Sequence, residues 1–479
     1  MIARLKQLKV PNLIKKRITL NSFMTKANLK SDSVVANSVD VSTIINFNPT
    51  NGTLENGIGL ENFKINGKKI TLSNDKKAEK IYYYKRFDNL LKTNDDRLVV
   101  YCDNKSLCYF KLNDKDLIEH QIDNINFSKQ PTAINYNYLG EDVLILSNDK
   151  DGLYLLNDNT INHIQNAPPI TSMCIHSERL FATTSGEGTT LWFSDDFNIE
   201  NWFVSLDEAG FIELPDDRGK MLKVISFLDY VYVFRAYGIS RITAYGKQQE
   251  FTVENLFSNV GKIYANTVTE CGDYIIFMAS SGIYKFNGME IVKILPFYDK
   301  YLDGVDNEES EGVFYNNKLY LNCNLMINKK IENCIIVYDI DTKIPYIANG
   351  LNVNSLLLIP GDLYKLCCLS KGEFVLVNNS GKRFNKILKK EWRSDYSDYS
   401  ILTPNKKLEK ITINTMQPIT IYIYCDNNKT LIYDLDSGHK EVSVNVKGQL
   451  FSFRIVSRTK SPLIYKPTLY FSYFKEDLW

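Results

Sequence analysis

Short apolar runs separated by turn residues dominate the chain from about residue 80 onward. A typical unit is a strand-like run, a turn with Gly or Asn and a second run with a central aromatic residue, as in 273–278 followed by 282–288. Two such runs joined by a short turn are typical of a β-hairpin. The high content of Tyr (30) and Phe (25) also favours β-structure, because these side chains suit half-buried pleated surfaces. The pattern predicts an all-β protein.

The second run of this unit recurs at a regular spacing. One marker residue per copy gives the series Tyr109, Tyr154, Trp192, Arg241, Tyr284, Tyr338 and Phe374. Six intervals from 109 to 374 have a mean of about 44 residues, close to the period of about 40–45 of a four-stranded propeller blade. Radial repetition also leaves only short strand edges exposed. We therefore predict a β-propeller of six to eight blades, with seven favoured.

Three sections of the chain differ in pattern. Residues 1–75 start with a basic stretch and continue as a segment rich in Ser, Asn, Thr and Gly, which predicts an extended N-terminal arm with short strands. Residues 76–390 contain the repeats and form the predicted propeller. Residues 391–479 lose the period but hold six strand-like runs within about 75 residues, a pattern that suits a C-terminal β-sandwich.

The charge of the chain is nearly balanced but unevenly distributed. A net charge of +1, from 57 basic and 56 acidic residues, argues against a protein coated in nucleic acid. The first 31 residues nevertheless carry eight cations and no anion, together with apolar residues that a solvated tail does not require. This stretch is either a frayed terminus or an arm that docks on a neighbouring subunit. The cations assigned to an assembly arm are Arg4, Lys6, Lys9, Lys15, Lys16 and Arg17.

No residue pattern indicates catalysis or metal binding. The sequence from Asp149 to Gly152 lacks the further ligands of a calcium loop and predicts a hairpin turn. The acidic run 303–311 predicts a solvated loop. A glycosidase needs two carboxylates at a fixed separation, and no spacing in the sequence pairs any two of Glu187, Asp195, Asp196, Glu200 and Glu208. The nine scattered Cys predict buried free thiols in a reducing cell. We expect no enzyme, no catalytic or metal-binding residue and no cofactor, and no apolar run suggests a signal or a membrane span.

The order of the sections resembles a known group of virion proteins. The likeness is carried by 45–48 with 52–54 and 57–59, by 180–184 with 191–195, and by 391–394 with 406–411. These segments are similar, in order and spacing, to the propeller proteins of tailed bacteriophages. They resemble in particular the packaged-DNA stabilisation or tail-hub proteins of short-tailed phages.

The resemblance implies a structural protein of the virion tail that is assembled in the host cytoplasm. Such a protein forms an oligomeric ring in the hub or head-to-tail region, extends the DNA channel, helps retain the packaged genome and anchors tail appendages. The implied partners are further copies of the chain, portal or adaptor proteins, tail appendage proteins and packaged DNA passing through the lumen, without membrane insertion. Two alternatives stay open. One is a glycan-binding propeller for receptor recognition, with the sandwich as a lectin, and the other is a cellular propeller scaffold.

Overall fold

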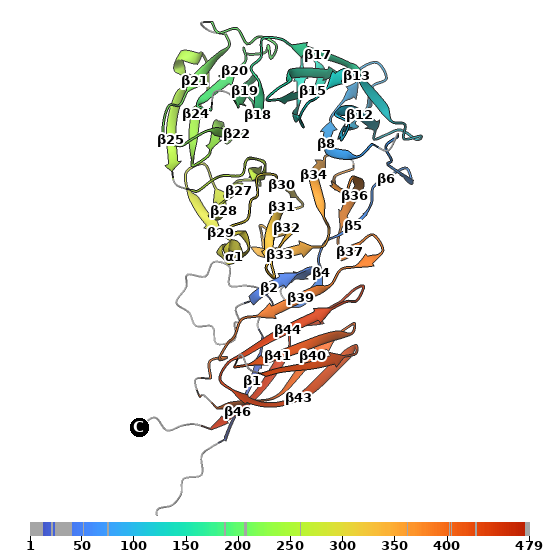
Figure 1. Cartoon of the computed structure of the whole chain (residues 1–479), viewed down its shortest axis with the longest axis vertical. Helices are drawn as coiled ribbons and strands as arrows, with labels where there is room; N and C mark the ends of the chain where they lie inside the picture. Colours follow the sequence, from blue (N-terminus) through green and yellow to red (C-terminus); the bar gives the residue numbers. More distant parts are fainter. Residues whose placement is uncertain are drawn as a thin grey trace, which may run out of the picture. The chain divides into compact units, whose positions relative to one another are not determined.

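A computed structural model shows a chain built almost entirely of strands, with 61% strand and 3% helix (Figure 1). It describes residues 13–20, 23, 41–50, 52–73, 76–185, 188–205, 208–258, 260–361, 363–401, 403, 405–426 and 429–474. The chain divides into two compact units. The propeller unit comprises Glu61–Asp341 and Leu351–Val377, and the sandwich unit comprises Met1–Leu60, Thr342–Gly350 and Asn378–Trp479.

The described part of the propeller unit contains seven consecutive groups of antiparallel strands, which follow one another around a ring (Figure 1). The first three groups are β8 (Ala78–Tyr84), β11 (Arg97–Cys102), β12 (Ser106–Lys111) and β13 (His120–Asn126); β14 (Thr132–Tyr138), β15 (Glu141–Asn148), β16 (Gly152–Asn157) and β17 (Thr160–Ile164); and β18 (Ile170–His176), β19 (Arg179–Thr184), β20 (Thr190–Phe193) and β21 (Gly210–Glu213). The other four are β22 (Met221–Phe227), β23 (Tyr230–Arg235), β24 (Gly238–Thr243) and β25 (Thr252–Ser258); β26 (Thr269–Glu270), β27 (Ile275–Ala279), β28 (Gly282–Phe286) and β29 (Ile291–Ile294); β30 (Glu311–Tyr315), β31 (Lys318–Ile327) and β32 (Lys330–Asp339); and β34 (Val353–Ile359), β35 (Lys365–Ser370) and β36 (Glu373–Asn378).

The prediction of an all-β propeller is confirmed. The number of strand groups lies within the predicted range of six to eight blades. Each marker residue lies in the third strand of its group, and the run before it forms the second strand. Tyr284, for example, lies in β28 and is paired with Phe277 of β27. All five residues of β27 are buried, and β27 lies between β26 and β28 in its sheet. The repeated sequence unit therefore corresponds to the hairpin formed by the second and third strands of each blade.

Hydrophobic clusters fill the spaces between neighbouring blades. One cluster joins Tyr82 and Val99 of the first group to Leu144 and Leu156 of the second. Another closes the ring, since it combines residues of β11 and β12 with residues of β35 and β36 and with Phe63. The backbone N–H of Phe63 donates to the C=O of Phe374 at 3.0 Å. A segment from the start of the unit thus binds the last blade, which fixes the two ends of the ring.

The sandwich unit consists of two sheets, and this confirms the predicted β-sandwich. The first sheet contains β1 (Leu13–Thr19), β46 (Thr468–Phe474), β40 (Lys406–Thr415), β43 (Gly438–Gly448), β45 (Ile464–Tyr465), β4 (Thr53–Asn56) and β3 (Phe47–Pro49). The second contains β33 (Ile344–Asn349), β2 (Val41–Ile45), β39 (Lys390–Ser394), β44 (Phe451–Ser457), β41 (Ile419–Cys425) and β42 (Lys429–Leu435).

The remaining elements of the described chain are short. They are the strands β5 (Gly59–Asn62), β6 (Lys64–Ile65), β7 (Lys68–Lys69), β9 (Phe87–Asp88), β10 (Thr93–Asn94), β37 (Lys382–Arg383) and β38 (Lys386–Ile387), the 3-10 turns Gln248–Glu250, Ala265–Thr267 and Pro296–Tyr298, and the helix α1 (Asp299–Leu302). Among the described residues, no helix combines the length and apolarity needed to cross a bilayer.

Aromatic side chains hold the two sheets of the sandwich together. The ring of Tyr399 contacts Phe453 of the second sheet and Phe471 of the first, with centroid separations of 5.9 and 5.5 Å. Trp392 is fully buried, meets the ring of Phe23 edge to face at 5.3 Å and donates its indole N–H to the Phe23 carbonyl at 3.1 Å. Residues from both ends of the chain therefore share one core.

This shared core moves the unit boundaries away from the predicted limits of 1–75, 76–390 and 391–479. Strand β1 pairs with β46 along its whole length, from Leu13 opposite Phe474 to Thr19 opposite Thr468. Strand β2 pairs with β39. The described residues up to 60 thus belong with the sandwich, while 61–73 pack with the propeller. Strand pairing between distant segments, which leaves no mark on local composition, is the physical reason for the difference.

Candidate functional site

The outer face of the second sandwich sheet is the most distinctive surface in the described chain. Strand β41 alternates strictly, with Ile419, Ile421, Ile423 and Cys425 buried toward the core. Its Thr420, Tyr422 and Tyr424 are half-buried on the opposite side, because successive side chains of a strand point to opposite faces. The strand thus supplies the core with one set of residues and leaves a polar, aromatic row outside.

Side chains from the neighbouring strands lie beside this row on the same face of the sheet. Register places Arg454 of β44 and Ile432 of β42 on either side of Tyr422. The Arg454 guanidinium lies 4.9 Å from the centre of the Tyr422 ring and donates two hydrogen bonds of 2.7 Å to the Glu391 carboxylate. Burial acts to raise the pKa of Glu391, but its hydrogen bonds to Arg454 hold that pKa below its usual value. Bidentate pairs of this kind fix both partners.

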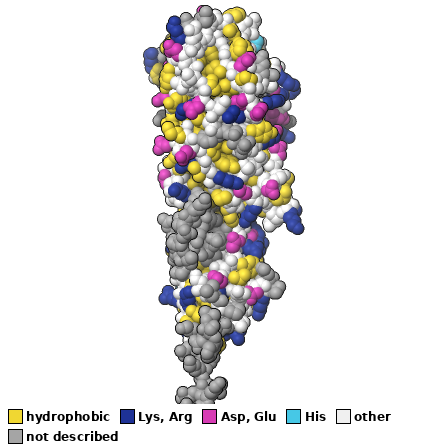
Figure 2. All heavy atoms as spheres, turned by 90° about the vertical axis from the view of Figure 1, so that its left-hand side faces the viewer, with side chains coloured by type: hydrophobic (Ala, Val, Ile, Leu, Met, Phe, Trp, Pro, Cys, Tyr) yellow, Lys and Arg dark blue, Asp and Glu magenta, His cyan; other side chains and the backbone are white. Residues whose placement is uncertain are grey.

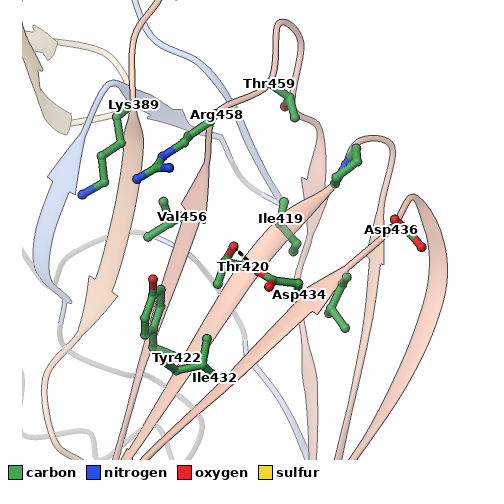
Figure 3. Close-up of a pocket in the computed structure, with 12 residues that line it drawn as sticks. Lys389, Ile419, Thr420, Tyr422, Ile432, Asp434, Asp436, Val456, Arg458 and Thr459 are labelled. Carbon is green, nitrogen blue, oxygen red and sulfur yellow. Dashed lines mark hydrogen bonds between the residues drawn. The ribbon is translucent and has the colours of Figure 1, made fainter.

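A hollow of about 740 Å³ lies on this face of the sheet (Figure 3). Its wall residues come from β41, β42 and β44, from the residues that flank these strands and from the residue before β39, and include Lys389, Thr420, Tyr422, Ile432, Asp434, Asp436, Val456, Arg458 and Thr459. Figure 3 shows Lys389 and Arg458 toward one side and Asp434 and Asp436 toward the other. The Thr420 hydroxyl donates to Asp434 Oδ1 at 2.6 Å. Arg458 and Asp436 make no hydrogen bond or ion pair with any described residue.

The sequence did not single out these residues. Thr420 and Asp434 are 14 positions apart and become neighbours only when β41 and β42 pair in the observed register. The alternating segment 419–425 is the one local signal that could have indicated a half-exposed polar row.

The predicted arm lies partly in the sandwich. Lys15, Lys16 and Arg17 belong to β1, where Lys16 donates to the Ser400 carbonyl at 3.2 Å and Arg17 lies 5.9 Å from the Tyr470 ring centre. Arg4, Lys6 and Lys9 lie outside the described residues. Docking of the arm on a neighbouring subunit stays a prediction. Lys16 and Arg17 thus contact residues of their own chain.

Two further predicted features lie in the propeller. Asp151 accepts hydrogen bonds from the Ser128 backbone and hydroxyl and from the Asn148 amide, so it stabilises the turn between β15 and β16. The acidic run is less solvated than predicted, because Glu311 is buried at the start of β30. Its carboxylate pairs with Lys80 and accepts the Leu356 N–H at 3.0 Å. The prediction of a solvated loop is therefore wrong for this residue.

The described residues contain no group of three or more His, Cys, Asp or Glu side chains that could hold a metal ion. The nine cysteines are buried and free, as predicted. Burial raises the pKa of the Cys174 and Cys271 thiols to about 12, which keeps them protonated and unreactive. On the face drawn in Figure 2, basic and acidic side chains are interspersed rather than gathered by sign.

No family model and no curated protein matches the chain. Among solved structures it is similar to BBS1N in its crystal structure with ARL6DN, with a TM-score of 0.41, 12% identity and coverage of 63% of this chain and 91% of that chain. It is also similar to Raptor of Chaetomium thermophilum, with a TM-score of 0.46, 10% identity and coverage of 69% of this chain and 29% of Raptor. Likenesses of this degree carry no information on function.

Proposed function

We propose that this protein is a structural component of a bacteriophage tail, placed in the hub or head-to-tail region. In this role copies of the chain form a ring, extend the DNA channel and hold tail appendages. The proposal rests on the sequence resemblance together with one structural observation, the commitment of charged side chains to internal pairs. Arg235, fully buried, bonds Asp216 at 2.5 Å, and Arg97 bonds both Asp95 and Asp158 at 2.5 Å.

Such pairing favours a rigid scaffold over an enzyme. Ion pairs that neutralise buried arginines hold neighbouring strands in fixed positions, whereas a catalytic centre needs charged groups that are free to act on a substrate. A ring component has to keep its shape under load, and the closed propeller and two-sheet core provide that. The balance of charge in the chain suits DNA passing through a lumen, because a strongly basic wall would retain it.

The arm that precedes β1 is the proposed contact with the portal or adaptor. Deletion of residues 1–9 removes Arg4, Lys6 and Lys9 but leaves β1 and its pairing with β46 intact. In phage carrying this deletion we expect heads without attached tails in electron micrographs. A control variant replaces the exposed propeller lysines Lys92, Lys105 and Lys115 by Gln and should assemble normally.

Two results would contradict the proposal. Mass spectrometry of purified particles should detect the chain in stoichiometric amounts, and its absence from particles would favour a cellular scaffold. Normal tailed particles from the 1–9 deletion would show that the arm does not make the proposed contact.

A further inference from the structure

We propose that the hollow on the outer face of the second sandwich sheet binds a neutral carbohydrate. The inference is independent of the tail proposal, because it rests only on the chemistry of the wall residues. Their charges, hydrogen-bonding capacity and apolar surface each narrow the class of ligand.

Charge selects a neutral ligand. Lys389 and Arg458 contribute two cations and Asp434 and Asp436 two anions, on opposite sides of the hollow (Figure 3). An anionic ligand would face the two carboxylates and a cationic ligand the two basic groups, so either would meet a like charge within the site. A neutral molecule that both donates and accepts hydrogen bonds can satisfy both sides at once.

Hydrogen-bonding capacity selects a ligand rich in hydroxyl groups. The Arg458 guanidinium and the Asp436 carboxylate have no partner among the described residues, and Asp434 accepts from Thr420 through only one of its oxygens. A carboxylate accepts from hydroxyl groups, and a guanidinium donates to hydroxyl or ring oxygens. A sugar ring carries both kinds of oxygen at close spacing, so one ligand can engage both groups.

The apolar part of the wall favours a ring with an apolar face. Tyr422 and the 59%-exposed Ile432 line the hollow and lie side by side, because they pair across β41 and β42. The C–H face of a hexose packs on such surfaces while its hydroxyl groups turn outward. The volume of about 740 Å³ lies in the range of about 300–1,000 Å³ of small-molecule sites, so it accommodates an oligosaccharide segment.

The site is also held in shape before any ligand arrives. The Glu391–Arg454 pair fixes the guanidinium over Tyr422, and the Thr420 hydroxyl fixes Asp434. Preorganised groups bind with a smaller loss of side-chain freedom. All of these residues belong to paired strands of one sheet, which is the rigid part of the unit.

The test uses the full-length protein on an array of neutral oligosaccharides built from glucose, galactose, mannose and N-acetylglucosamine, with sialylated and sulfated counterparts. Affinities for the neutral compounds that bind are then measured by titration calorimetry for the parent and for Asp434→Asn and Arg458→Gln. We expect either substitution to weaken binding about tenfold or more, since each removes a charged hydrogen-bond partner. Asp434→Asn retains an oxygen that can accept from Thr420, so the fold is preserved.

The matched controls are Glu441→Gln and Lys440→Gln, which change charge on β43 of the other sheet. They should leave affinity unchanged. Binding to sialylated or sulfated compounds alone would overturn the proposal, as would the absence of binding to any neutral compound at millimolar concentration. An equal loss in the hollow variants and the controls would also overturn it.

Discussion

Lys390 offers a direct test of the sandwich core, because it places an ammonium group where no water reaches. Lys390 is fully buried, and its Nζ donates to the carbonyls of Thr459 at 2.8 Å and Leu388 at 3.4 Å. Burial, with a contribution from the nearby charge of Lys382, lowers the pKa of Lys390 from 10.5 to about 8. The perturbation is Lys390→Met, which keeps most of the side-chain volume and removes the titrating group.

The sign of the effect follows from proton binding. Between about pH 8 and 10.5 the unfolded chain keeps the Lys390 proton and the folded chain has lost it, so this group adds stability as pH rises. From pH 7 to pH 9 the gain is about 1 kcal/mol, and over the full range it is about 3 kcal/mol. Buried thiols with raised pKa values act in the opposite direction, since their contribution falls as pH rises. The informative quantity is therefore the difference between parent and variant, in which the thiols cancel.

The assay is equilibrium urea unfolding at pH 7, 8 and 9, followed by tryptophan fluorescence, to which the buried Trp392 contributes. The free energy of unfolding of the parent minus that of Lys390→Met should rise by about 1 kcal/mol between pH 7 and 9. Lys389→Met, at an exposed neighbouring lysine that pairs with Glu391 at 3.2 Å, is the control and should show no such rise. A parent–variant difference that stays constant across this range would refute the reasoning about the buried ammonium.

Three further predictions concern packing and pairing. Phe23→Ala should destabilise the sandwich by about 3–5 kcal/mol, since it opens a cavity beside Trp392; a melting temperature equal to that of the parent would contradict the shared core. Asp216→Asn should cost about 2–3 kcal/mol, because it leaves the buried Arg235 without its anion while Asp216 itself is a quarter exposed; Asp436→Asn, at an exposed unpaired carboxylate, should leave thermal unfolding unchanged. The nine thiols should resist a thiol reagent at pH 8 in the native protein and react together in urea; rapid labelling of the native chain would show that the burial is wrong.

The propeller was predictable because the second and third strands of each blade are recognisable from their local sequence. Strands such as β27, IIFMA, are buried along their entire length and therefore form continuous apolar runs in the sequence. Outer strands such as β17 mix exposed polar and buried residues, and β26 has only two residues, so neither stands out from the loops. The spacing of the third strands was enough to identify the architecture without them.

The sandwich was predictable only in part. The segments 419–425 and 468–474 coincide with β41 and β46, whose apolar residues alternate or cluster locally. The assignment of β1 to the same sheet was out of reach, because its partner lies 449 residues away at Thr468 and one sequence carries no information on pairing. The hollow was not predictable for the same reason. Strand pairing, and not closeness in the sequence, brings Thr420 next to Asp434.

The pairing of β1 with β46 has a consequence for synthesis. At about 5–20 residues per second, β1 leaves the ribosome about 20 to 90 seconds before the strand that covers it. During that interval a seven-residue β-prone segment has both edges open, which is the condition under which strands aggregate. Lys15, Lys16 and Arg17 place three positive charges in the middle of this segment, LIKKRIT, and like charges keep copies on neighbouring nascent chains apart. The cations of β1 thus protect an unpaired strand while the rest of the chain is made.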